Sequence, residues 1–194
     1  MIERMAGPDL SFGAQEVRAR VSEAAFGSPL VVNHFRGLVA EAIVASALEP
    51  EWTWCSADWA GWDFERADGL RLEVKQSASR QTWTVGGGAP STCRFDIRAR
   101  TGSNVGSRGQ SANGRAADIY VFAHHFDGSA SADHCDPAQW RFFVLPERPL
   151  PRAKTIGLRG VEKLAEPCSV IQLPDLVDAC ALGVALEMKG RPAL

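Results

Sequence analysis

Residues 61–77, GWDFERADGLRLEVKQS, contain two runs of alternating apolar and charged residues separated by a short Ala-Asp-Gly break. Glycine readily takes the left-handed conformation that closes a three-residue hairpin loop. We therefore predict a β-hairpin with its loop at residues 67–69. In this register Asp63 lies opposite Glu73, and Lys75 follows two residues later on the same strand.

The two faces of this hairpin differ sharply because side chains alternate along a strand. One predicted face is apolar and carries Trp62, Phe64, Leu72 and Val74, and the other is charged and carries Asp63, Glu65, Arg71, Glu73 and Lys75. A two-residue turn at 68–69 would mix the faces, and such a slip is disfavoured where one face is buried.

The charged face contains one matched pair and one mismatched pair. Glu65 and Arg71 are predicted to form a cross-strand ion pair, whereas Asp63 and Glu73 are like charges that repel unless a cation lies between them. Hard carboxylate oxygens suit Mg²⁺ or Mn²⁺. With Lys75 on the same face, these residue types favour metal-dependent phosphodiester cleavage. The alternative is a solvated hairpin face without a ligand.

A helix is predicted over residues 33–48, where Asn33 can cap its start and Pro50 follows its end. Glu41 lies among mostly apolar or small residues of this helix, so we expect it to be partly buried. A buried carboxylate needs a partner or a metal. Glu41 is therefore a candidate for the metal site, and an ion pair with an arginine such as Arg36 is the alternative.

Asp63 followed by Glu73-Val74-Lys75 resembles the PD-(D/E)xK nuclease superfamily, which has the restriction-endonuclease-like fold. The resemblance covers about residues 33–75, and Trp62 stands where many members have proline. The segment EVKQSASRQTW is also similar to that of uncharacterised bacterial proteins.

The resemblance implies a set of roles for these residues. Asp63 and Glu73 would bind the metal, the Val74 carbonyl would be a further ligand, and Glu41 would be the helix glutamate. Lys75 would assist the nucleophile. Gln76 and Gln81 follow the lysine and would touch the site or the nucleic-acid backbone.

Residues 71–115 hold eight basic and only two acidic residues, so this segment carries a charge of +6 although the whole chain carries −2. Clusters of arginine bind phosphate backbones. We therefore select Arg80, Arg94 and Arg98 as phosphate-contact residues. A Gly/Ser/Arg-rich loop is expected at about residues 84–116, and we expect it to order on nucleic acid; a solvated loop is the alternative.

The rest of the chain predicts a single α/β domain over residues 1–194, with a mixed central β-sheet flanked by α-helices. Further helices are expected near 14–25, 158–165 and 173–188, and strands near 52–56, 118–126 and 140–145, with a short strand or turn within STCRFDIRA (residues 91–99). Five scattered cysteines indicate neither a disulfide framework nor a zinc site. No apolar run is long enough for a membrane span, and no signal peptide is recognisable, so we expect a cytoplasmic protein without a membrane partner.

Together these observations predict a Mg²⁺- or Mn²⁺-dependent nuclease whose expected substrate is DNA. Two alternatives remain open at this point. One is a catalytically inactive nuclease-like module that binds nucleic acid or protein, and the other is a metal-dependent phosphohydrolase acting on a small phosphorylated substrate. A homodimer is also left open.

Overall fold

The structure is a computed structural model, and it describes residues 13–31, 33–55, 61–81, 92–99 and 114–189. Its helices are α1 (Ala14–Phe26), α2 (Asn33–Leu48), the short α3 (Leu158–Val161), α4 (Leu173–Lys189) and the 3-10 turn η3 (Pro137–Gln139). Its strands are β1 (Trp52–Trp54), β2 (Phe64–Arg66), β3 (Arg71–Ala78), β4 (Arg94–Asp96), β5 (Ile119–His125), β6 (Trp140–Pro146) and β7 (Thr155–Gly157).

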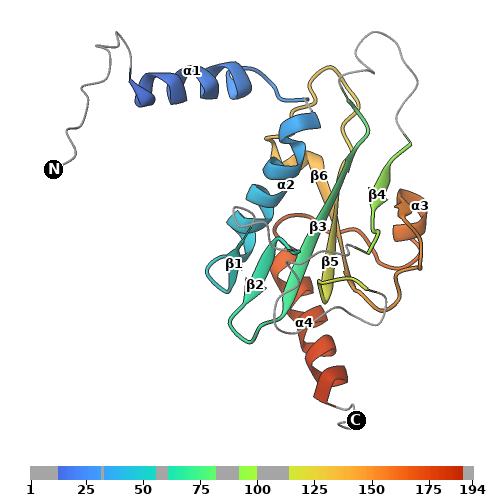
Figure 1. Cartoon of the computed structure of the whole chain (residues 1–194). Coiled ribbons are helices and arrows are strands. Elements are labelled where there is room, and N and C mark those ends of the chain that lie inside the picture. Colours follow the sequence, from blue (N-terminus) through green and yellow to red (C-terminus); the bar gives the residue numbers. More distant parts are fainter. Residues whose placement is uncertain (1–12, 32, 56–60, 82–91, 100–113, 190–194) are drawn as a thin grey trace, which may run out of the picture.

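Five strands form one mixed sheet in the order β1-β2-β3-β5-β6. The central pair β3 and β5 is parallel, from Leu72↔Ile119 to Ala78↔His125, and the other pairs are antiparallel. Every residue of β5 is buried, as expected for a parallel strand that is covered on both faces. The predicted mixed α/β architecture is confirmed (Figure 1).

Helices α2 and α4 cover one face of this sheet. Their apolar residues share a core with Leu72 and Val74 of β3 and with Val121 of β5. Helix α2 is rich in alanine on its inner side, and Ala40 and Ala45 are buried there. Small side chains allow the helix to lie close to the sheet. Glu41 is then near enough to Asp63 for its charge to act on the Asp63 carboxylate.

The opposite face is covered by a second, two-stranded sheet of β4 and β7 together with α3. Phe95 of β4 packs edge-on against Phe122 of β5, with ring centroids 5.1 Å apart. Strand β7 and its pairing with β4 were not predicted, and the helix expected over 158–165 is a single turn. Both faces of β3 are therefore buried.

Helix α1 extends away from the rest of the molecule (Figure 1) and buries none of its residues. Its last residue, Phe26, packs on Phe35 of α2 with ring centroids 5.5 Å apart. Across the part of the chain that the structure describes, no helix combines the length and apolar character that crossing a membrane requires.

Three buried histidines lie at the end of β5 and in the loop that follows. His125 and His134 pack together with ring centroids 4.7 Å apart, and both contact Trp140. Burial lowers the pKa of His125, and it lowers the pKa values of His124 and His134 to about 4. These histidines are therefore neutral in the folded protein at pH 7.

The buried histidines predict an acid-sensitive fold. In the unfolded chain these histidines become protonated below about pH 6.5, whereas in the folded protein His124 and His134 stay neutral down to about pH 4. The free energy of unfolding therefore falls as the pH falls from about 6.5 to 4. Replacing His134 with Phe should reduce this loss by roughly 1–3 kcal/mol between pH 7 and pH 4. Urea unfolding at several pH values measures it. Replacing the exposed His34 with Gln is the matched control, and an equal effect of both substitutions would contradict the prediction.

Candidate active site

The hairpin forms in the predicted register. Phe64 pairs with Leu72 and Glu65 pairs with Arg71. The Arg66 N–H donates to the Leu70 carbonyl at 2.9 Å, which closes the loop. Gly69 has a φ of 80°, a conformation that glycine adopts without strain.

The ladder ends one residue earlier than predicted. Asp63 and Glu73 do not form a paired rung, because residues 61–63 bend away from the strand. The Asp63 N–H donates instead to the Leu72 carbonyl at 3.0 Å. Its carboxylate Oδ2 accepts the Val74 N–H at 2.7 Å, so Asp63 reaches across the open edge of β3 beside Glu73.

The same bend places Trp62 on the opposite face from the one predicted. Trp62 belongs to the core that contains Tyr120 and Phe122, and the Arg71 guanidinium lies 3.9 Å from its ring centroid. The strict alternation expected for Trp62 required a strand that continues through residue 62. The chain leaves the strand before that point, and the expectation was therefore wrong.

The charged face of β3 is buried and is not solvated. The Glu73 residue is only 5% exposed, and the Lys75 side chain is 14% exposed. The Lys75 ammonium donates to the Glu73 carboxylate. Taking a charge out of water costs free energy unless the charge is paired and hydrogen-bonded. The ion pair between Glu73 and Lys75 therefore offsets part of the free-energy cost of burying both groups.

Asp63 is the group most affected by this environment. Burial, followed by the negative charges of Glu73 and Glu41, raises the pKa of Asp63 to about 7. The Val74 N–H and the positive charge of Lys75 act in the opposite direction but do not compensate. Three carboxylates thus act on one small region, where a divalent cation would relieve their repulsion.

Glu41 reaches this region from α2. It is half-buried, and its Oε2 accepts the indole N–H of Trp54 at 3.1 Å. The arginine considered as its ion-pair partner has other contacts, since Arg36 donates to Gln76 and to Asn33. Trp54 was not anticipated as a site residue, because a contact between a helix and a strand 13 residues away leaves no local signal in the sequence.

The donor set is sparse but suits magnesium. Within the described ranges, no three His, Cys, Asp or Glu side chains gather closely enough to hold a metal. The N–H and C=O of one strand residue point to the same edge, so the Val74 carbonyl faces the side on which Asp63 lies. Mg²⁺ keeps several waters and is bound by one or two carboxylates together with substrate phosphates. Asp63, Glu73 and this carbonyl fit that requirement.

The glutamines and Arg80 lie elsewhere. Gln76 points to the α2 face of β3, where it accepts from Arg36, and is thus on the other side of the strand from Glu73 and Lys75. Gln81 is buried and donates to the Ala78 carbonyl at 3.3 Å. Arg80 donates to the carbonyl of Ser129. The structure therefore does not bring these three side chains together with the carboxylates.

Arg94 and Arg98 are exposed around β4, which contacts β3. Asp96 lies between them and pairs with Arg98 at 3.2 Å. Although burial opposes the change, Arg98 and then Lys75 lower the pKa of Asp96. Strand β4 covers the face of the sheet that carries Lys75. Because Phe95 faces Phe122 of β5, the alternating Arg94 and Asp96 side chains lie on the outer, exposed side of β4. Most of the predicted loop at 84–116 lies outside the described residues.

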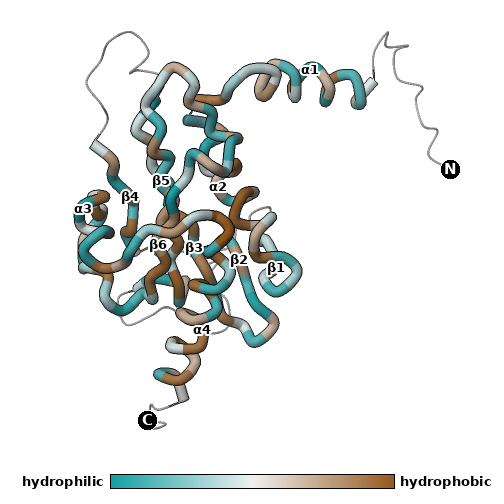
Figure 2. Tube along the Cα trace, turned by 180° about the vertical axis from the view of Figure 1, so that it is seen from behind, coloured by the Kyte–Doolittle hydropathy of each residue, from teal (hydrophilic) through white to brown (hydrophobic). Residues whose placement is uncertain are grey.

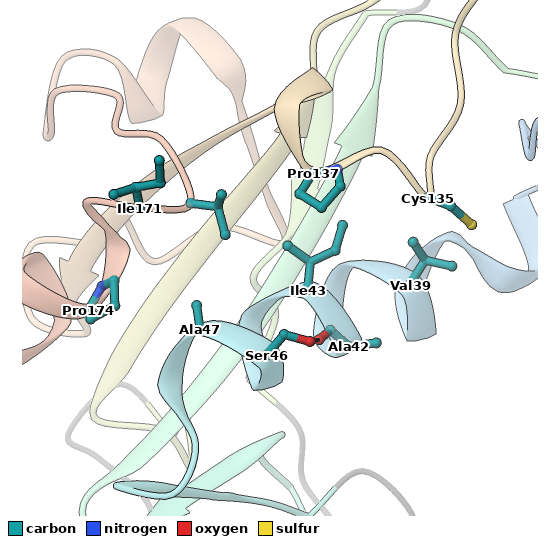
Figure 3. A pocket seen from close by; sticks show the side chains of 10 residues that line it. Val39, Ala42, Ile43, Ser46, Ala47, Cys135, Pro137, Ile171 and Pro174 are labelled. Atoms are coloured by element: carbon teal, nitrogen blue, oxygen red, sulfur yellow. Dashed lines mark hydrogen bonds between the residues drawn. The ribbon is translucent and has the colours of Figure 1, made fainter.

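A cavity of about 590 Å³ lies between α2 and the segments that carry Pro137 and Ile171 (Figure 3). Val39 and Ile43 of α2 form one side, and Pro137, Ile171 and Pro174 form the other. Its lining is mainly apolar and contains no carboxylate, so it lacks the groups that metal-dependent hydrolysis needs.

Comparison with models of known protein families gave no match, and a search of curated proteins found no relative. The roles of the site residues therefore rest on the sequence motif and on the geometry described above.

Asp63→Asn should stabilise the metal-free protein at high pH. Asparagine keeps an oxygen that can accept from Val74 and removes the charge. Ionised Asp63 lowers stability as the pH rises from about 4 through 7, so the variant should gain roughly 2–4 kcal/mol at pH 8 and little at pH 4. Urea unfolding in the presence of a chelator measures both values.

Glu73→Gln is the control for this prediction. It also removes a negative charge next to Asp63, but it leaves the half-buried Lys75 ammonium without its partner, which is destabilising. A stabilisation by Glu73→Gln equal to that by Asp63→Asn, or none by Asp63→Asn at pH 8, would show that charge crowding at Asp63 is not the dominant effect.

Proposed function

We propose that this protein is a divalent-metal-dependent nuclease of the PD-(D/E)xK type that hydrolyses phosphodiester bonds in DNA. The observation that carries the proposal is the placement of the Asp63 carboxylate, which accepts the Val74 N–H beside the buried Glu73–Lys75 ion pair; burial and the neighbouring carboxylates also raise the pKa of Asp63 to about 7. Strongly perturbed carboxylates with an adjacent lysine are typical of functional sites. The mixed sheet flanked by helices is compatible with the restriction-endonuclease-like fold.

Each oxygen donor would have its own role at the metal. Asp63, Glu73 and the Val74 carbonyl would hold Mg²⁺ or Mn²⁺, and Glu41 would support the site from α2. The bound ion would supply positive charge and lower the pKa of a coordinated water. Ionisation of Asp63 is required for this role, and its pKa of about 7 places that step close to neutral pH.

Lys75 is the residue with a role specific to catalysis. Hydrolysis forms a bond from a water oxygen to phosphorus and breaks the bond to the leaving sugar oxygen, which takes up a proton. Negative charge grows on the phosphoryl oxygens during this exchange. The ammonium of Lys75, held by Glu73 in a site largely closed to water, is suited to stabilise this charge and to orient the attacking water.

Arg94 and Arg98 would bind the phosphate backbone next to the reacting group. Both are exposed; Arg94 begins β4 and Arg98 follows the strand by two residues. A guanidinium group offers a planar fork to phosphate oxygens. Two exposed arginines in one short segment favour a polynucleotide over a small phosphorylated substrate, because each can contact a separate phosphate.

One observation favours the alternative of an inactive binding module. The Glu73–Lys75 ion pair and the Val74–Asp63 hydrogen bond satisfy these groups within the protein. Such a network could serve the fold alone. The two functions differ in their dependence on metal, because a binding module needs none.

Lys75→Ala should abolish cleavage but not DNA binding, and it should also lower stability because the buried Glu73 carboxylate loses its partner. Plasmid, linear and single-stranded DNA with Mn²⁺ or Mg²⁺ provide the assay, and circular dichroism checks the fold. Lys154→Ala, at an exposed lysine before β7, is the matched control and should cleave normally. Cleavage by Lys75→Ala at the wild-type rate would remove Lys75 from the mechanism, and DNA binding without cleavage by the wild type under any metal would favour the binding module.

Replacing Arg94 and Arg98 with Ala should flatten the salt dependence of DNA binding. Each lost phosphate contact lowers the slope of log affinity against log salt by about 0.9, so the double variant should lose about 2. The matched control removes the same charge from α1 by Arg18→Ala with Arg20→Ala. Equal slopes for the wild type and the β4 variant would place the DNA elsewhere.

A further inference from the structure

Strand β1 is short, Trp52–Trp54, and forms the outer edge of the main sheet. Figure 2 shows it beside β2 and close to α2. It pairs antiparallel with β2, with Trp54 opposite Phe64. The last residue of β1 and the residue that follows it contact two of the three carboxylates of the candidate site.

The indole of Trp54 contacts the carboxylate of Glu41. Its Nε1–H donates to Glu41 Oε2 at 3.1 Å. An indole nitrogen can only donate, so this contact requires an oxygen of Glu41 that is turned toward the ring. The ring itself is held in place, because it stacks on Phe64 with ring centroids 6.4 Å apart and packs against the core below α2. Trp54 therefore fixes one carboxylate oxygen of Glu41 from a rigid support.

The indole holds Glu41 without cancelling its charge. Across the described segments, no lysine or arginine forms an ion pair with this carboxylate. A paired cation would neutralise Glu41 and compete with a metal ion, whereas a neutral donor leaves the negative charge in place. That charge acts on the site, since it contributes to the raised pKa of Asp63. The hydrogen bond engages Oε2, so Oε1 can face an ion or a metal-bound water.

The end of β1 also holds the main chain of Asp63. The N–H of Cys55, the residue after Trp54, donates to the Asp63 carbonyl at 2.8 Å. This bond lies at the bend where the ladder between β2 and β3 has ended. Two successive residues at the end of one strand therefore fix Glu41 through its side chain and Asp63 through its backbone.

We propose that Trp54 is a positioning residue of the metal site, which orients Glu41 toward the ion that Asp63 and Glu73 would hold. This role rests on the proposed metal-dependent nuclease activity. Carboxylates at metal sites are themselves hydrogen-bonded by outer residues, and loss of such a partner typically weakens metal binding by about 10–100-fold. Trp54 acts through Glu41 and needs no contact with the metal or with the reacting groups.

Calorimetric titration of Mn²⁺ into the full chain tests this role with a double-mutant cycle. Trp54→Phe removes the N–H but keeps an aromatic ring on Phe64, and it should weaken Mn²⁺ binding roughly tenfold. In a Glu41→Ala background the same substitution should change the affinity by less than about twofold, because no carboxylate is left to orient. A general disturbance of β1 would weaken binding equally in both backgrounds.

Trp52→Phe is the matched control. It makes the same change two residues earlier in β1, where the indole Nε1 is buried and has no hydrogen-bond partner among the described residues, so the Mn²⁺ affinity should not change. Circular dichroism shows whether each variant is folded. Mn²⁺ binding that Trp54→Phe leaves unchanged, that it weakens equally in both backgrounds, or that Trp52→Phe weakens as much overturns the positioning role alone. A wild type that binds no Mn²⁺ overturns the proposed function as well.

Nuclear magnetic resonance tests the hydrogen bond itself in the metal-free protein. After ¹⁵N labelling the chain gives indole N–H signals from its six tryptophans. Glu41→Ala should shift the assigned signal of Trp54 more than that of any other tryptophan. Added Mg²⁺ should also shift the Trp54 signal in the wild type but not in Glu41→Ala. A Trp54 signal that does not respond to Glu41→Ala would show that the contact is not formed, and the proposal would then be wrong whatever the metal affinity.

Discussion

The cost of holding negative charge away from water governs the region around Asp63. Its carboxylate is fixed by the Val74 N–H at the point where the β2 ladder ends, and burial together with Glu73 and Glu41 raises its pKa to about 7. Buried charges are costly, and hydrophobic replacements of them are often neutral or stabilising, so the charge of Asp63 beside Glu73 and Glu41 works against stability. A divalent cation bound beside Asp63 would relieve this repulsion.

The architecture explains how the site obtains its environment. Strand β3 lies at the centre of the sheet, and its two faces carry different kinds of side chain. One face packs Leu72 and Val74 against α2 and α4, while the other carries Glu73 and Lys75 beneath the cover that β4 and β7 provide. The ladder partner of β3 stops at Phe64, which leaves the edge beside Val74 open for Asp63. A site of this kind needs both a rigid strand and a terminated neighbour.

Much of this could be predicted from the sequence because it depends on local patterns. The hairpin register follows from the loop chemistry at residues 67–69, and the bounds of α2 follow from its composition and flanking residues. The face of Trp62, the burial of Glu73 and the contact between Trp54 and Glu41 could not be predicted in this way. Each depends on where distant segments pack, and the alternation of a strand gives no warning of a bend at residues 61–63. Strand β7 was missed for the same reason, since its pairing with β4 is a tertiary contact between short segments.

Calorimetric titration of Mn²⁺ into the metal-free protein addresses the central claim most directly. Repeated at pH 6.5 in buffers with different ionisation enthalpies, it reports both the binding and the protons that are released. Binding at one site should expel close to one proton, because Asp63 is largely protonated at that pH and must ionise to hold the ion, and Asp63→Asn should remove both the binding and the release. Absence of Mn²⁺ binding by the wild type, or binding that neither releases protons nor depends on Asp63, would contradict a metal site at these carboxylates.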